Sequence, residues 1–296
     1  RTTSVQFAGA NALEVSGQIT LNAPGNNNRS AYIDVDAGAM TCSSISMTDG
    51  GSNRRDCYIS VGNGTVIITG DITMQGANDR NYFLFNGAGT LYVGGAMTGG
   101  GITSNGGGGT TAPTSGPVCF NGTGDQILPA YNFYNLTLAG GGQKVLTGAV
   151  TVNNILALNG AVLELDNFNL TVASNVANAI QGTFDASNMI ATNGAGYLVK
   201  NATSAQPLYP IGSGGYYSPV TISSVTPNTG VLRIRAVPQA LNPSYLKKYW
   251  DVTTSDARTS VTATFQYDPA EENGAAQTVS FSPDGGSTWQ SPIATG

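Results

Sequence analysis

Histidine is absent from the 296-residue chain. Without an imidazole there can be no Ser-His-Asp or Cys-His catalysis, no histidine-ligated metal and no histidine pH switch. What remains is carboxylate chemistry or no chemistry. We therefore expect a protein that is not an enzyme and that uses no metal or other cofactor.

Charge is also scarce, since 10% of the residues are charged against roughly 25% in an average globular domain. The 12 basic and 17 acidic residues give a net charge of −5. Nucleic-acid binders carry clustered lysine and arginine on a basic domain, so we expect no nucleic-acid partner. No apolar run approaches the roughly 18 residues of a membrane-spanning helix, and we expect no membrane span.

The chain has 3 cysteines, and an odd number excludes a complete disulfide framework. One bridge or buried free thiols remain open, and the length of the chain favours free thiols because a large core needs no staples. Strong helix formers are too few to fill long helices, whereas Gly, Thr, Val, Ile and aromatic residues abound, which suits turns and strands. This composition predicts an all-β fold.

Internal repetition is the main signal. Gly38, Gly64 and Gly89 close three similar segments at intervals of 26 and 25 residues. Apolar residues recur in three columns between these glycines: Leu13, Met40, Val66 and Leu91; Val15, Cys42, Ile68 and Val93; Ile19, Ile45, Ile72 and Met97. Alternation with polar residues is a strand pattern. Repeats of this length predict a right-handed parallel β-helix (β-solenoid) whose coils stack roughly 4.8 Å apart.

Two changes in amino-acid composition divide the chain. Residues 99–116 are rich in Gly, Thr, Ser and Asn, which predicts a loop that leaves the solenoid. After Gly196, prolines cluster and longer alternating strands appear, which is typical of antiparallel sheets. We therefore expect a solenoid over residues 1–196 and a small antiparallel β-sandwich over residues 197–296 that caps its open end.

One candidate binding site is a row of amide and guanidinium groups in the polar turns. It consists of Asn28, Arg29, Asn53, Arg55, Asn78 and Arg80. Such a row could bind sugar hydroxyls or an acidic polysaccharide. The alternative is a turn ladder in which asparagines bond the backbone and arginines pair with Asp56 or Asp79.

Hydrolysis of a glycosidic bond needs two acids close together. Asp34 and Asp36 share a strand face, but the aligned repeats place Ser60 and Phe85 in the column of Asp34. Glu164 and Asp166 are also neighbours on one face. We expect all four to be solvated surface acids.

The later segments resemble the solenoid repeats of large secreted surface proteins and adhesins of Bacteroidota. The resemblance is carried by residues 120–127 (FNGTGDQI), 133–138 (FYNLTL) and 163–172 (LELDNFNLTV), and by residues 197–200 (YLVK), 208–212 (LYPIG) and 248–252 (KYWDV) that resemble the β-module following such repeats. Members are typically exported by the type IX secretion route and end in a sorting domain, which is not recognisable here. The resemblance implies a mature or excised segment of a secreted protein, and it carries no catalytic residues.

These features predict a non-catalytic extracellular protein at the cell surface, a rigid structural or adhesive solenoid that self-assembles into filaments end to end or edge to edge. Its other expected partner is a glycan or cell-surface ligand. The alternative is a carbohydrate-binding or polysaccharide-degrading β-helix protein.

Overall fold

Strands make up almost all of the regular structure. The computed structural model describes residues 3–7, 9, 11–48, 55–76, 80–105, 112–240, 246–272, 279–282 and 290–294. In these residues the strands are interrupted by one 3₁₀ helix, η1 (Pro269–Glu271). No helix in the described residues has the length and apolar character needed to cross a membrane. The predicted all-β class is confirmed.

The first sheet has five parallel strands contributed by successive repeats. Its order is β1-β3-β5-β8-β11. The strands are β1 (Thr3–Phe7), β3 (Arg29–Val35), β5 (Arg55–Val61), β8 (Asn81–Phe85) and β11 (Gly101–Thr103).

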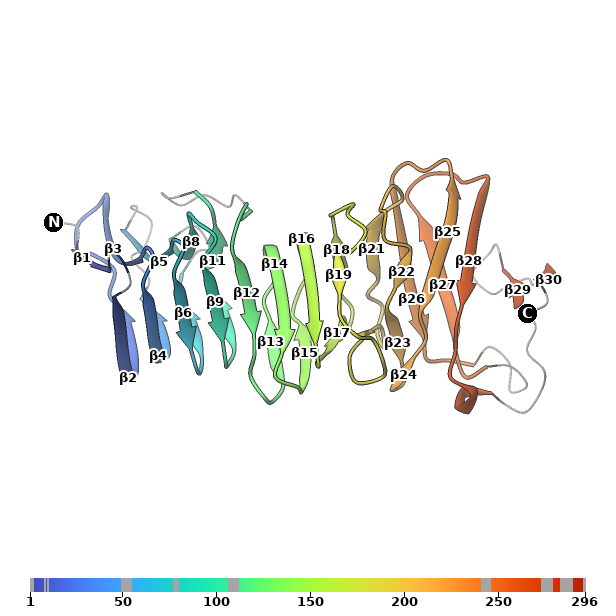
Figure 1. The fold of residues 1–296 in the computed structure, drawn as a ribbon, viewed down its shortest axis with the longest axis horizontal. Coiled ribbons are helices and arrows are strands. Elements are labelled where there is room, and N and C mark those ends of the chain that lie inside the picture. The colour runs from blue at the N-terminus through green and yellow to red at the C-terminus, as the bar shows by residue number, and fades with distance from the viewer. Residues whose placement is uncertain are drawn as a thin grey trace.

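The second sheet has fourteen strands and runs through the whole molecule (Figure 1). Its first members are β2 (Ala12–Leu21), β4 (Ala39–Met47), β6 (Thr65–Ile68), β7 (Ile72–Met74), β9 (Thr90–Val93), β10 (Met97–Gly99) and β12 (Pro117–Phe120). It continues through β14 (Asn132–Ala139), β16 (Val150–Asn159), β18 (Leu170–Val172), β19 (Ile180–Gln181), β21 (Leu198–Asn201), β26 (Val231–Val237) and β27 (Tyr249–Thr254). All pairs are parallel up to β21, and β26 and β27 then add as antiparallel strands.

The third sheet serves the later repeats, in the order β13-β15-β17-β20-β23-β24. The strands are β13 (Gln126–Leu128), β15 (Gln143–Leu146), β17 (Val162–Glu164), β20 (Ile190–Ala191), β23 (Ile211–Ser213) and β24 (Tyr216–Tyr217). The pairs are parallel as far as β23, and β24 is antiparallel to it.

The three predicted apolar columns are confirmed by the strand register. Leu13 lies opposite Met40, Met40 opposite Val66 and Val66 opposite Leu91; the columns of Val15 and Ile19 are paired in the same way. The first column continues through Val118, Leu136, Leu156 and Ile180. Parallel in-register pairing places like residues above one another along the stack.

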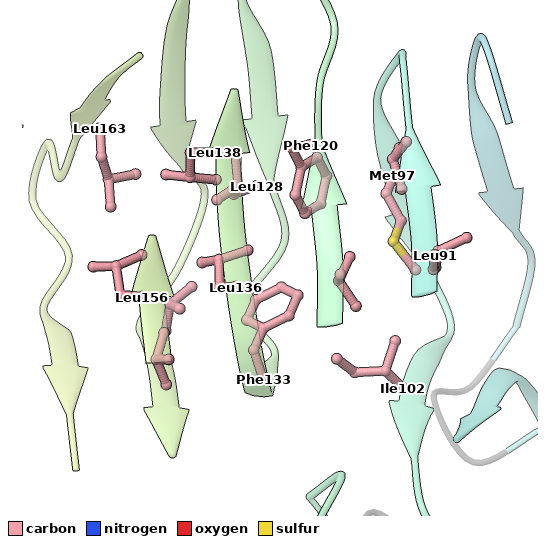
Figure 2. Close-up of a cluster of buried hydrophobic side chains, with 14 of the residues drawn as sticks. Leu91, Met97, Ile102, Phe120, Leu128, Phe133, Leu136, Leu138, Leu156 and Leu163 are labelled. Carbon is pink, nitrogen blue, oxygen red and sulfur yellow. The ribbon is translucent and has the colours of Figure 1, made fainter. Parts of the chain in front are cut away.

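The interior between the sheets is one continuous apolar core. Figure 2 shows part of it, where Leu91, Phe120, Leu136 and Leu156 come from successive strands. Cys42 lies in the second column, 1% exposed, and all three cysteines are buried free thiols, as predicted. Burial raises the pKa of the Cys42 thiol to about 11, so this side chain behaves as a small apolar residue.

The last part of the chain turns antiparallel. A separate sheet of β22 (Leu208–Tyr209), β25 (Val220–Thr226) and β28 (Ser260–Phe265) has the order β22-β25-β28. It packs on the long sheet through Trp250 and Phe265, whose ring centroids are 5.2 Å apart. The strands β29 (Val279–Phe281) and β30 (Gln290–Ala294) pair with each other.

Strand pairing crosses the boundary expected at residue 197. The pairs β18–β21 and β20–β23 join the two sides, and Leu232 and Ile234 belong to the same core as Leu136. The antiparallel strands expected there are present, and they extend the stack. The division into domains at 197 stays a prediction.

The Gly-rich segment begins later than predicted. β10 and β11 occupy Met97–Gly99 and Gly101–Thr103, and Ile102 is a core residue opposite Phe83. These strands could not be predicted from composition alone, because glycines flank the single apolar residue Ile102. Residues 104–105 and 112–116 contain no strand, and residues 106–111 lie outside the described residues.

Candidate functional site

The arginines of the predicted row lie where the strands of the first sheet begin. Arg29 opens β3 directly opposite Arg55, which opens β5. The preceding Asn28 has a left-handed backbone (φ 57°), a conformation that asparagine tolerates better than most residues. Arg55 donates from Nε and Nη2 to the Asn27 side-chain oxygen, at 3.2 and 3.0 Å. A turn asparagine therefore holds this guanidinium group.

Arg80 is one position out of the predicted column. It precedes Asn81, which lies opposite Cys57, so Arg80 falls beside Asp56. Its guanidinium lies 3.4 Å from the Asp56 carboxylate, with side chains only 16% and 8% exposed. The turn after β8 has one residue more than the turn after β5. Because the repeats were aligned on their closing glycines, this extra residue before Gly89 displaced the predicted position of Arg80 by one.

The structure thus brings Arg29 and Arg55 together and places Arg80 in an ion pair. This pair is the alternative that the sequence had left open for Asp56. Asn53 and Asn78 lie outside the described residues. Arg29 is exposed, and its guanidinium can bind a carboxylate or a sugar hydroxyl from solvent.

A stack of tyrosines lies beside this row, and the sequence analysis did not predict it. Tyr32, Tyr58 and Tyr82 are in register, with ring centroids 4.7 and 5.1 Å apart and planes within 3°. Burial and the neighbouring tyrosines and acids raise the pKa of Tyr58 to about 12. Because the rings cover one another's faces, no sugar ring can stack between them. The recurrence of tyrosine at the repeat interval was the signal in the sequence.

The strand register places no second carboxylate in the column of Asp34. The column of Asp34 holds Ser60 and Leu84, one position from the expected Phe85, because of the same longer turn. Glu164 is 8% exposed, which corrects its assignment as a solvated acid. Its carboxylate accepts hydrogen bonds from the Asp166 backbone at 3.1 Å and from the Asn193 amide at 2.5 Å, and so fixes a turn.

Buried polar side chains in the later repeats donate hydrogen bonds to backbone carbonyl groups. Gln126 donates to the carbonyls of Val93 (3.0 Å) and Gly95 (2.7 Å), and Lys144 donates to those of Gly122 (2.8 Å) and Gly124 (3.1 Å). The signal for these residues was their place in alternating strands, where Lys144 has the parity of the buried Leu146. These contacts satisfy backbone groups at the turns and rigidify them.

One shallow depression combines acids and aromatic rings. It has a volume of about 610 Å³ and is lined by Phe184, Asp185, Ala186, Tyr217, Pro219, Phe265, Gln266, Tyr267, Asp268 and Pro269. Asp185 accepts hydrogen bonds from the Ser187 hydroxyl and backbone, which lower its pKa. Asp268 caps η1 through the Ala270 backbone at 2.9 Å. A lowered pKa is the reverse of what a general acid needs.

No group of three or more His, Cys, Asp or Glu side chains in the described residues could hold a metal ion. Comparison with protein-family models, with curated proteins and with solved structures finds no match to this chain.

Proposed function

We propose that the chain is a right-handed parallel β-solenoid that acts, without catalysis, as a rigid structural or adhesive module outside the cell. On this proposal the protein is secreted and works at the cell surface. Its action is geometric, because stiff stacked repeats hold exposed side chains at a fixed spacing.

The observation that carries the proposal is the continuous column of apolar residues along the long sheet. Apolar residues lie opposite one another from Leu13 through Ile180, and the core residues between them are almost fully buried. Successive repeats pair through the strands of the long sheet from β2 to β21, which resists bending of the stack. The turn contacts of Gln126 and Lys144 add to this stiffness.

The adhesive part of the proposal depends on Arg29. Its exposed guanidinium at the start of β3 suits an acidic polysaccharide, whereas Arg80 is already paired with Asp56. Retention in a gel that contains polygalacturonate measures such binding. We expect Arg29→Ala to reduce the retention and Arg80→Ala, the matched control, to leave most of it. Equal retention of wild type and Arg29→Ala would contradict this role.

The depression around Asp185 and Asp268 favours a second candidate, a carbohydrate-binding or carbohydrate-cleaving site. Aromatic rings beside carboxylates are typical of sugar sites. Incubation with neutral and acidic polysaccharides, followed by measurement of reducing ends, separates the candidates. The structural proposal predicts no release. Release that Asp268→Asn abolishes would overturn it in favour of this second candidate.

A further inference from the structure

A second pocket lies where the three-stranded sheet meets the long sheet. Its walls come from β21, β22, β25 and β26 and from the turns 202–207 and 227–230. Figure 1 shows these strands beside one another in the C-terminal half of the stack. The pocket has a volume of about 300 Å³, at the lower end of the roughly 300–1,000 Å³ of small-molecule sites. This size suits a single small molecule.

The Tyr209 side chain lines this pocket, although it is only 2% exposed. Its ring lies 4.4 Å from the Lys200 amine, but its hydroxyl makes no hydrogen bond to any described residue. Burial raises the pKa of Tyr209, so the hydroxyl keeps its proton and can both donate and accept. Buried hydroxyls are almost always hydrogen-bonded, and this exception therefore points to a partner outside the chain.

Three further polar side chains of the pocket have hydrogen-bonding capacity to spare. Thr203 and Asn228 are exposed, and their side chains make no hydrogen bond within the described residues. Asn201 donates from Nδ2 to the Ala173 carbonyl and to the Asn175 side chain, both at 3.0 Å, which leaves its own oxygen available. Hydroxyl and amide groups that donate and accept match the hydroxyls of a sugar.

The pocket offers nothing to a charged ligand. None of the described residues that line it is charged. The Lys200 amine is already engaged by the carbonyls of Gln206 and Leu208 and by the Tyr209 ring. An ionised ligand would lose its hydration here without meeting an opposite charge. The apolar side chains of Ile222 and Leu232 complete the lining, and they suit the C–H groups of a sugar ring.

The walls of the pocket are fixed by hydrogen bonds within the chain. Gln206 accepts from the Ile180 backbone and donates to it, both at 2.7 Å. The Ala202 backbone donates to the Gly230 carbonyl at 2.9 Å and so ties the two turns together. A pocket that is already ordered binds its ligand with a smaller entropic cost.

We propose that this pocket binds one neutral hexose, with the Tyr209 hydroxyl as its central hydrogen-bonding group. The groups around the sugar are Thr203, Asn228 and the side-chain oxygen of Asn201. The pocket shares no lining residue with the depression around Asp185 and Asp268. The inference goes beyond the proposed structural role and does not depend on it.

Saturation-transfer NMR with D-glucose, D-galactose and D-mannose tests the pocket, and D-galacturonate serves as the charged counterpart. We expect at least one neutral hexose to bind, and galacturonate to bind at least tenfold more weakly. Tyr209→Phe removes only the hydroxyl and should weaken hexose binding roughly tenfold. Its urea midpoint should equal that of wild type, because the hydroxyl has no protein partner to lose. Tyr217→Phe, in the other depression, is the matched control and should bind like wild type.

Three results would overturn the proposal. The first is the absence of transfer to all three neutral hexoses, and the second is equal affinity of wild type and Tyr209→Phe. The third is preferential binding of galacturonate, which would contradict the neutral character of the site. Binding that Tyr217→Phe abolishes and Tyr209→Phe keeps falls under the second result and would place the sugar in the depression around Asp185.

Discussion

The buried lysines of the stack differ in whether an acidic side chain neutralises their charge. Lys248 lies 2.6 Å from the carboxylate of Glu271. Lys200 bonds only backbone carbonyls in the described part of the chain, those of Gln206 at 2.5 Å and Leu208 at 3.0 Å, and lies 4.4 Å from the centroid of the Tyr209 ring. Burial lowers the pKa of Lys200 to about 7. A buried ammonium without a counter-charge opposes folding.

Lys200 should therefore make stability depend on pH. Between the folded pKa of about 7 and the ordinary value of 10.5, the unfolded chain holds a proton that the folded chain has lost, so the free energy of unfolding rises with pH. Below pH 7 both states carry the charge, and its burial cost is present in full. We expect Lys200→Met to gain stability relative to wild type at pH 6 and to lose this advantage by pH 10, measured as urea midpoints. Contributions from Lys144 and Lys248 are common to both proteins and cancel.

The control for this prediction is Lys247→Met, because Lys247 is exposed. Its midpoint should differ from that of wild type by the same amount at both pH values. A pH-independent difference for Lys200→Met would show that the buried amine does not titrate in this range.

At the scale of elements, the turn glycines set the spacing between repeats. A Cβ atom on Gly64 would overlap the backbone carbonyl oxygen of Gly38, and one on Gly89 would overlap that of Gly64. The backbone itself is in the way at these positions, so no side-chain rotation relieves the overlap. This explains why glycine recurs at the end of successive repeats.

Gly64→Ala is expected to lower the free energy of unfolding by about 2 kcal/mol or more, because strands β4 and β6 must separate to admit the methyl group. Gly25→Ala, where a Cβ meets nothing within 4 Å, should change stability by no more than about 0.5 kcal/mol. Chemical denaturation of the two variants measures both values. Equal midpoints would show that adjacent turns are not in close contact.

The elements also show which structural features the sequence patterns could predict and which they could not. The columns of Leu13, Val15 and Ile19 were predictable because alternation fixes which residues face inward. The position of Arg80 was not, since one added residue in a turn moves a whole strand without altering its pattern. Glu164 was misjudged and Lys144 was missed because each depends on a partner from another repeat, the Asn193 side chain for Glu164 and the carbonyls of Gly122 and Gly124 for Lys144, which local sequence does not reveal.

At the scale of the molecule, the stack and its antiparallel end share one core. Eleven strands follow one another from β2 to β27, and ten steps of about 4.8 Å give a row about 48 Å long. The antiparallel strands β26 and β27 extend this row. The antiparallel character was predictable from longer alternating strands, whereas their attachment depends on contacts distant in sequence, such as Leu198 with Ile234.

Small-angle X-ray scattering tests the central claim, a rigid rod of stacked repeats, most directly. A compact globule of 296 residues would have a radius of gyration of roughly 19 Å. The account predicts a clearly larger radius of gyration and a distance distribution skewed towards short distances with a long tail. A symmetric distance distribution with a radius of gyration near 19 Å would contradict it.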